Sequence, residues 1–210
     1  MKKTATLFVL IAIVFFSCSK DDDTPFGAPV ALDAQAITAS SFVASWEPVS
    51  GAVQYEVQVT MDSTFALLDT TLKNQDGTTV SVDAKDNAQY YYRVRAANEG
   101  GDFSSWSNVI GVHTLPLAPY ALNASNVGED AFRANWEAVE GIEDYLLYVS
   151  TVSFPNEGMG MLPDYNGVEV NSTAMFVTGL QSMTLYYYVV RSASGDYISK
   201  DSNSISVFTQ

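Results

Sequence analysis

The stretch that decides the fold reads Phe42-Val-Ala-Ser-Trp-Glu-Pro-Val-Ser-Gly-Ala-Val-Gln-Tyr55, and a near copy runs from Phe132 to Tyr145. In each copy Phe, Ala and Trp alternate with smaller or polar residues, which is the two-residue period of a half-buried β-strand. A turn that contains Gly follows, and the Tyr opens a second alternating strand. We therefore predict a strand-turn-strand unit that occurs twice.

The repeat extends beyond these two strands. Between Ala28–Gly51 and Ala118–Gly141, 11 of 24 aligned positions are identical, including the Trp-Glu pair. A chain of 210 residues accommodates two domains of about 90 to 100 residues, each long enough to bury its own core. Helical periodicity is absent after the first 17 residues, and turn clusters recur at strand-like spacing, so both domains are predicted to be all-β.

The charge of the chain excludes one class of partner. The formal net charge is −14, and removal of Lys2 and Lys3 with the N-terminal segment brings it near −16. Nucleic-acid affinity rests on cationic side chains that displace counterions from phosphates, so binding to DNA or RNA is not expected. The acidic surface is interpreted as a source of solubility.

The N-terminus has the features of an export signal. Residues 1–17 carry two lysines followed by an unbroken apolar run from Leu7 to Phe16, which is too short to cross a hydrocarbon core about 30 Å thick. Its end, Ser17-Cys18, resembles the lipobox of bacterial lipoproteins. The resemblance implies cleavage before Cys18, lipid attachment at Cys18, and no other contact with the membrane.

An acidic run follows the cysteine. The segment Ser19-Lys20-Asp21-Asp22-Asp23 resembles the surface-export signal of lipoproteins in some Gram-negative bacteria, which implies an outer-membrane protein that faces the cell exterior. Residues 18–27 as a whole are polar and have nothing to bury, so we expect a flexible tether. Cys18 is the only cysteine, so an intramolecular disulfide is impossible.

The later strands identify the kind of domain. They are expected at Thr78–Ala84, Tyr90–Ala96 and Asn108–Thr114, and the stretches Ala84-Lys-Asp-Asn-Ala-Gln-Tyr90 and Ser-Trp-Ser-Asn108, together with Trp46, resemble a fibronectin type III domain. The second copy has Trp136, Leu180-Gln-Ser-Met-Thr-Leu-Tyr186 and Ser202-Asn203. The resemblance implies two tandem immunoglobulin-like β-sandwiches, at residues 28–115 and 116–210.

Two further features follow from the resemblance and the composition. In the family, a Leu six residues before a Tyr belongs to a tyrosine corner. The second domain keeps this residue as Leu180, whereas the first has Ala84, so the first corner is expected to pack less well. Between the domains, Leu-Pro-Leu-Ala-Pro at residues 115–119 restricts the backbone and predicts a semi-rigid, elongated pair.

The usual catalytic constellations are missing from the sequence. His113 is the only histidine, and its position in a strand favours a plain solvent-facing residue. Glu99-Gly-Gly-Asp102 lies between strands, not before a helix, so it is not a phosphate loop. We therefore predict no catalytic residues, no metal site and no cofactor.

Two segments leave a choice open. Trp106 lies in a loop where a ligand could bind, but Arg93 and Arg95 project from the neighbouring strand, and a guanidinium stacked on the indole is the favoured interpretation. The Met-rich segment from Phe154 to Gly167 is predicted to be an irregular loop. It either packs on its own sandwich or offers an adaptable contact.

A comparison of outward positions in the two domains predicts a binding surface. In the first domain the outward residues are expected to form a polar, solvated face: Glu56, Gln58, Tyr91, Arg93 and His113. The corresponding residues of the second domain are all apolar or aromatic: Leu146, Tyr148, Tyr187, Val189 and Phe208. Unless the Met-rich loop or the first domain covers them, they form one exposed patch, the usual mark of an interaction site.

The sequence leaves two non-enzymatic functions in competition. The first is a cell-surface binding or adhesion module that takes a glycan, peptide or protein ligand through its second domain. The second is a structural subunit that assembles with another outer-membrane lipoprotein. An enzyme is the third and least supported class.

Overall fold

The computed structural model describes residues 26–155 and 159–210. The predicted signal peptide, Cys18 and the acidic run after it lie outside the described residues. The strands of the first half are β1 (Ala31–Gln35), β2 (Ser41–Trp46), β3 (Gln54–Thr60), β4 (Thr70–Gln75), β5 (Thr79–Asp83), β6 (Gln89–Ala97) and β7 (Ile110–His113). The strands of the second half are β8 (Ala121–Ser125), β9 (Ala131–Trp136), β10 (Asp144–Ser150), β11 (Met161–Val170), β12 (Ala174–Thr178), β13 (Leu185–Ser194), β14 (Tyr197–Ile198) and β15 (Ile205–Phe208).

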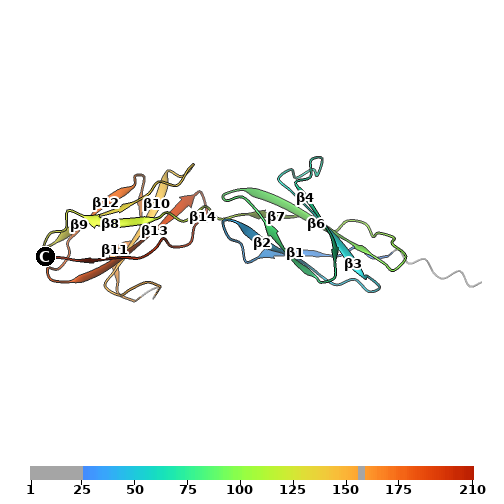
Figure 1. The fold of residues 1–210 in the computed structure, drawn as a ribbon, viewed down its shortest axis with the longest axis horizontal. Coiled ribbons are helices and arrows are strands. Elements are labelled where there is room, and N and C mark those ends of the chain that lie inside the picture. Colours follow the sequence, from blue (N-terminus) through green and yellow to red (C-terminus); the bar gives the residue numbers. More distant parts are fainter. Residues whose placement is uncertain (1–25, 156–158) are drawn as a thin grey trace, which may run out of the picture.

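Each half forms a sandwich of two antiparallel sheets (Figure 1). In the first, the order β1-β2-β5 faces the order β4-β3-β6-β7. In the second, β12-β9-β8 faces a larger sheet in which β11-β10-β13 continues to β14, and β15 also pairs with β13. The third, sixth and last strands of each repeat are therefore neighbours.

Both cores consist of the residues that the two-residue period points inward. The alternation that points Glu56 and Arg93 outward predicts a core-facing set on the third, sixth and last strands: Tyr55, Val57, Val59, Tyr90, Tyr92, Val94, Ile110 and Val112. All of these are buried except Ile110, which is half-buried against the same core. Trp46 packs on Tyr55 with ring centroids 5.4 Å apart, and the repeat places Trp136 on Tyr145 at 5.8 Å. The prediction of the core-facing set in the first domain is confirmed.

Both tyrosine corners are formed. The backbone N–H of Lys85 donates to the hydroxyl of Tyr90 at 2.9 Å, and that of Gln181 donates to Tyr186 at 2.9 Å. The packing beside them differs, because Leu180 is buried in the second core whereas Ala84 is half-buried and lines a surface cavity of about 300 Å³. The prediction of a less well-packed first corner is confirmed, although its hydrogen bond is equally short.

The prediction for the Met-rich segment is wrong in part. Residues 161–167 lie in β11, the edge strand of the larger sheet, rather than in an irregular loop. The pairing with β10 shifts between Tyr148 and Ser150, so that β11 carries extra residues around Pro163. An edge strand tolerates proline at such a bulge because an N–H that faces solvent is not needed there.

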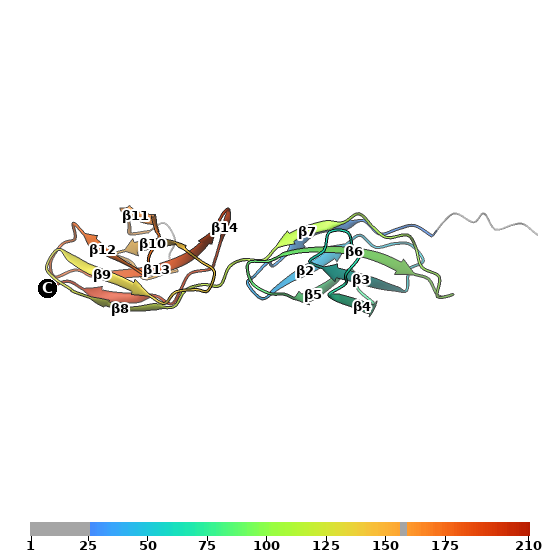
Figure 2. The same ribbon diagram turned by 90° about the horizontal axis from the view of Figure 1, so that it is seen from above.

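The two sandwiches lie end to end (Figures 1 and 2). The described chain begins at the far end of the first sandwich and ends at Gln210, at the opposite end of the molecule. Pro116 and Pro119 of the connection are buried, as is Pro29 at the start of the first domain. The described part of the chain contains no helix with the length and hydropathy that a membrane span requires.

Candidate interaction surface

The outer face of the larger sheet in the first domain is built from a stack of cations and rings. Arg93 lies with its guanidinium carbon 4.2 Å from the ring centroid of Phe65 and 4.6 Å from that of Trp106. Arg95 lies 4.6 Å from the same indole and 3.8 Å from Phe103. Trp106 therefore stands between two guanidinium groups, and the stacked interpretation of this residue is the one the structure shows.

Carboxylate and amide side chains complete this stack. Glu56 is only 5 % exposed and accepts a bond from Arg95 at 2.9 Å, while Gln58 accepts two from Arg93 at 2.9 and 2.8 Å. Burial, with a smaller contribution from Arg95, lowers the pKa of Arg93, which nevertheless stays charged at any ordinary pH. The prediction of a solvated polar face is wrong for Glu56, whereas the other four predicted residues are half-buried: Gln58, Tyr91, Arg93 and His113. The long side chains pair with one another and cover part of the sheet.

A short loop presents Phe65 to this stack. The carboxylate of Asp62 accepts backbone N–H bonds from Thr64 at 2.9 Å, from Ala66 at 3.0 Å and from Leu67 at 3.2 Å. The side-chain bond from Thr64, followed by these backbone bonds, lowers the pKa of Asp62. With the loop fixed in this way, Phe65 is held in a left-handed conformation with φ of 58° and is buried.

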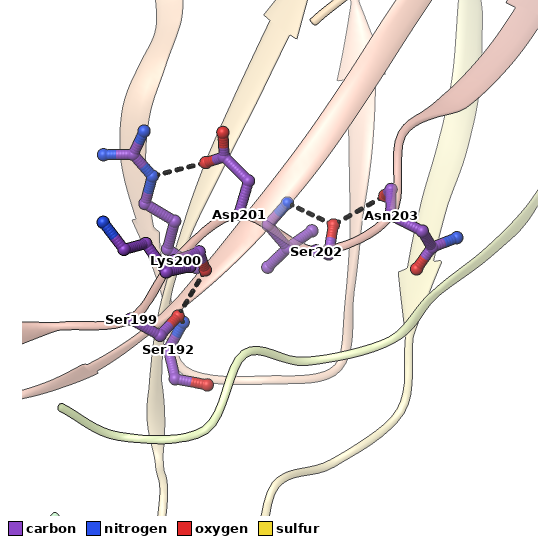
Figure 3. Close-up of polar contacts among 8 residues, drawn as sticks. Ser192, Ser199, Lys200, Asp201, Ser202 and Asn203 are labelled. Atoms are coloured by element: carbon purple, nitrogen blue, oxygen red, sulfur yellow. Dashed lines mark hydrogen bonds and ion pairs between the residues drawn. The ribbon is translucent and has the colours of Figure 1, made fainter. Parts of the chain in front are cut away.

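The second domain replaces the aromatic stack with an ion pair. Ser107 and Ser202 each accept a backbone N–H bond from the neighbouring long strand, so the residues before them, Trp106 and Asp201, are structurally equivalent. Asp201 accepts a bond from Nε of Arg191 at 2.6 Å, the dashed contact of Asp201 in Figure 3. The guanidinium of Arg191 also lies 4.7 Å from the ring centroid of Tyr148.

The five residues predicted as a patch differ in exposure. Val189 is 1 % exposed, Leu146, Tyr148 and Tyr187 are half-buried, and Phe208 is 57 % exposed. The prediction of a single exposed patch is therefore wrong at its centre, because no partner can reach Val189.

Part of the Met-rich segment packs against the end of β10. The hydroxyl of Ser150, whose Cα is paired with that of Tyr187, donates to the carbonyl of Met159 at 3.1 Å, and Thr151 N donates to the carbonyl of Gly160 at 2.9 Å. A Cβ at Gly160 would lie 2.7 Å from the side chain of Val152, so the backbone at this position is too close to β10 and the turn after it for any residue larger than glycine. The segment thus packs on its own sandwich at this end, although Met159 itself is 63 % exposed.

The exposed apolar surface lies farther along the same sheet than predicted. Leu185 is the direct pairing partner of Phe208, and the two are 42 % and 57 % exposed. Met183, two residues before Leu185, is 72 % exposed. Sequence reasoning missed Leu185 and Met183 because the comparison of outward positions stopped at Tyr187. Extending the alternation two residues toward the turn would have found Leu185.

His113 is not a plain solvent-facing residue. Its ring stacks on Tyr197 of the second domain, with centroids 3.8 Å apart and planes at 9°. Ring-on-ring contact at this distance ties the end of β7 to the β13–β14 hairpin. Within the described ranges, no three His, Cys, Asp or Glu side chains are grouped so that they could hold a metal ion.

Comparison with known proteins agrees with this architecture. The family model for the fibronectin type III domain matches residues 27–112. A two-domain fibronectin type III segment of chicken tenascin is 17 % identical with a TM-score of 0.52, covering 87 % of this chain and 100 % of that one. The FN1–FN3 domains of chicken CNTN1 are 17 % identical with a TM-score of 0.42, covering 89 % of this chain and 66 % of that one.

The sandwich topology and the first of these structures establish the fold. The family model covers the first domain, and the second domain repeats its strand order, tyrosine corner and tryptophan packing. The described chain thus has the fold of two fibronectin type III domains in tandem.

Proposed function

We propose that the protein is a non-enzymatic binding or adhesion module of the cell surface, with its binding surface on the second domain and the first domain as a spacer. The observation that carries this proposal is the exposed pair Leu185 and Phe208, which lie side by side on the larger sheet with Met183 beyond them. Exposed apolar side chains that gather in one place mark interaction sites more often than scattered ones do.

The contrast between the domains supports this division of roles. The equivalent face of the first domain is occupied by the stack of Arg93, Arg95 and Trp106, in which both guanidinium groups lie against the indole ring. At the pair of positions that corresponds to Leu185 and Phe208, the first domain has Gln89 and His113, and His113 already contacts the second domain. The first domain therefore offers less free apolar surface on this face.

The anchoring half of the proposal rests on the sequence of the N-terminus. Lipidation at Cys18 would tether the chain to the outer membrane, and the run Asp21–Asp23 would direct it to the outer face. The variant Cys18→Ser is expected to leave the membrane fraction. Replacement of the three aspartates by alanine should keep the lipid but lower protease accessibility on intact cells. Wild-type membrane recovery of Cys18→Ser would refute the anchor, and unchanged accessibility would reduce the acidic run to a spacer.

The binding half is tested on purified residues 19–210, which contain every described strand. They are screened against arrays of glycans and of matrix proteins, and the double variant Leu185→Ser, Phe208→Ser is then compared with wild type. Binding should fall at least about tenfold while the melting temperature changes little, because both side chains are exposed.

A matched control distinguishes binding at this surface from nonspecific binding by any exposed aromatic ring. Phe176→Ser removes a ring of similar exposure, 53 %, from β12 in the opposite sheet and is expected to bind as wild type does. Equal binding by the double variant and wild type would refute the proposed surface. A large drop in the melting temperature of the double variant would show that the pair is a packing surface instead.

The alternative, an assembly subunit that holds a partner lipoprotein, uses the same surface. It is favoured by the end-to-end junction inside this chain, where one domain already receives another at the equivalent position. A ligand found on the arrays supports the adhesion module. Stable co-purification with one membrane protein, abolished by the Leu185 and Phe208 substitutions, supports assembly.

A further inference from the structure

The first domain has an open side between its two edge strands. β5 ends the order β1-β2-β5 and β4 ends the order β4-β3-β6-β7, and the two strands lie on the same side of the sandwich (Figure 2). Both contribute to the cavity of about 300 Å³ beside the first tyrosine corner. Its floor is formed by three buried core residues, Val59, Val82 and Tyr90. The volume is at the lower end of the range for ligand sites, which suits a single side chain.

The second domain fills the equivalent space with two side chains of its own. Tyr165 of β11 and Leu180 of the tyrosine corner are 9 % and 8 % exposed, and both belong to the second core. Their counterparts in the first domain are the smaller residues Thr70 and Ala84, which line the cavity. The floor has the same residue types in both domains, and its second copy consists of Val149, Val177 and Tyr186. The cavity therefore occupies the space that a tyrosine and a leucine fill in the other copy.

The register of the edge strands establishes that Thr70 corresponds to Tyr165. Gln58 of β3 pairs with the residue directly after Thr70. Its counterpart in β10, Tyr148, pairs with the residue directly after Tyr165. The repeat itself therefore shows which side chain this space accommodates, namely a tyrosine.

A backbone donor at the cavity lacks the acceptor that its counterpart has. In the second domain the N–H of Thr178 donates to the hydroxyl of Tyr165 at 2.8 Å. Asp83 is the counterpart of Thr178, since each directly follows the valine that pairs with the phenylalanine of β2 or β9. The bond from the N–H of Ala84 to the carbonyl of Ser40 fixes the pairing so that the N–H of Asp83 points away from β2, toward the open side. Within the described part of the chain, no acceptor receives this N–H, so it is available to a ligand hydroxyl.

The rim of the cavity is apolar on one side and carries a net negative charge. Met61 lines the cavity, is 47 % exposed, and offers an adaptable apolar contact. Asp69, Asp83 and Lys85 are exposed and line it as well. Two carboxylates against one ammonium group favour a ligand with a cation beside its ring.

We propose that this cavity of the first domain is a second binding site, which receives a tyrosine side chain from a positively charged segment of a partner protein. The ring packs on Val59 and Val82, as Tyr165 packs within the second core, and its hydroxyl accepts the N–H of Asp83. The neighbouring cation lies near Asp69 and Asp83. The site goes beyond the proposed function, because it gives a ligand to the domain that this function uses as a spacer.

The position of the cavity favours a polypeptide over a free phenol. β4 and β5 are both edge strands, and edge strands present unpaired backbone groups on which an extended segment can lie. Tyrosine also combines an apolar ring with a polar tip, which matches a buried apolar floor beside one backbone donor.

The probe is the capped pentapeptide Gly-Lys-Tyr-Lys-Gly, titrated into isotope-labelled residues 19–210 and followed by NMR. Saturable shifts should be confined to the cavity, at Val59, Val82, Asp83, Ala84 and Tyr90. The same peptide with Phe in place of Tyr should bind about threefold to tenfold more weakly, because it lacks the hydroxyl that accepts from Asp83. The peptide Gly-Glu-Tyr-Glu-Gly should also bind more weakly, and added salt should reduce that difference.

Two variants of the protein fill the cavity from within. Thr70→Tyr and Ala84→Leu each introduce the residue of the second domain, so the peptide should bind at least about tenfold more weakly while the melting temperature is kept or raised. Both are made because the second domain has an extra residue, Gly179, before its leucine. Ser81→Phe is the matched control, since it introduces the second domain's Phe176 on β5 outside the cavity and should bind as wild type does.

Three results would overturn the proposal. The first is the absence of saturable shifts at the cavity, or wild-type binding by both filled variants. The second is binding of p-cresol as tightly as the lysine peptide, which would make this a site for a free phenol. The third is self-association of the protein alone that Ala84→Leu abolishes, which would make a second copy the occupant.

The test is independent of the proposed function. The double variant Leu185→Ser, Phe208→Ser should bind the lysine peptide as wild type does, because both changes lie in the second domain. A ligand on the arrays that requires Leu185 and Phe208, with no binding of the peptide, would keep the proposed function and overturn the cavity site.

Discussion

At the scale of single residues, one buried tyrosine links the two sheets of each sandwich. The hydroxyl of Tyr92 donates to the carbonyl of Leu32, and that of Tyr188 donates to the carbonyl of Leu122. Both rings are fully buried, and burial raises the pKa of Tyr92 and Tyr188 above 10.0, the ordinary value. Neutral hydroxyls that bridge two strands are thus part of each core.

The first prediction concerns Tyr188→Phe. The change keeps the ring but leaves the Leu122 carbonyl without its donor, so the free energy of unfolding should fall by about 1 to 3 kcal/mol. Urea denaturation measures the loss. Tyr187→Phe, in the same strand but on the outer face, is the control and should cost less than about 0.5 kcal/mol. Equal effects of the two changes would contradict the bridging role.

The same tyrosines predict a loss of stability at alkaline pH. Their folded pKa values are raised, so the stabilisation is fully present below the unfolded value near 10 and is lost as the pH rises through the folded value. Thermal melts from pH 8 to about 11.5 should show the midpoint falling above about pH 10. The fall should be shallower in Tyr188→Phe, and an identical pH profile would contradict this assignment.

At the scale of elements, the outer faces of the two larger sheets are covered by different side chains. The first covers its outer face with Arg93, Arg95 and three rings supplied by loops. The second places Val189 and Asp201 at two of these positions, and the described end of the Met-rich segment bonds to Ser150 at the end of β10. One strand order therefore supports a charged, closed face in one domain and an apolar, partly open face in the other.

Trp106→Ala is the prediction at this scale. Each cation–π contact at such a site contributes about 0.5 to 1 kcal/mol, so losing two should lower the stability of the first domain by about 1 to 2 kcal/mol. Calorimetry measures the change. Asp201→Ala, the equivalent change in the second domain, breaks a half-buried ion pair that still contacts solvent and should cost about 0 to 1 kcal/mol. The interpretation fails if Trp106→Ala melts as wild type does.

At the scale of the whole molecule, the stack of His113 on Tyr197 supplements the buried prolines of the connection. The elongated pair shown in Figure 2 places the end of the second domain that holds Gln210 far from the start of the first. A spacer that is held in line would present that end away from the membrane if Cys18 is lipidated. Alignment of the domains is therefore relevant to the proposed binding role although it contributes no binding residue.

Tyr197→Ser should loosen this alignment without unfolding either domain. The side chain is 39 % exposed, so the melting temperature should change little, whereas small-angle scattering and residual dipolar couplings should report a wider range of inter-domain angles. Phe176→Ser, remote from the junction, is the control and should keep the wild-type orientation. Unchanged couplings in Tyr197→Ser would mean that the prolines alone hold the domains in line.

The sequence by itself determined the repeat, the sandwich fold and the inward face of each strand. These follow from local periods and motifs. The alternation at Phe42–Trp46 and the corner motif from Ala84 to Tyr90 are both set by residues that are close in the sequence. The burial of Glu56 and Val189, and the exposure of Leu185 and Phe208, were decided by tertiary structure. They depend on which loop, ring or domain covers each position, and those partners come from distant parts of the chain, as Trp106 does for Arg93 and Tyr197 for His113.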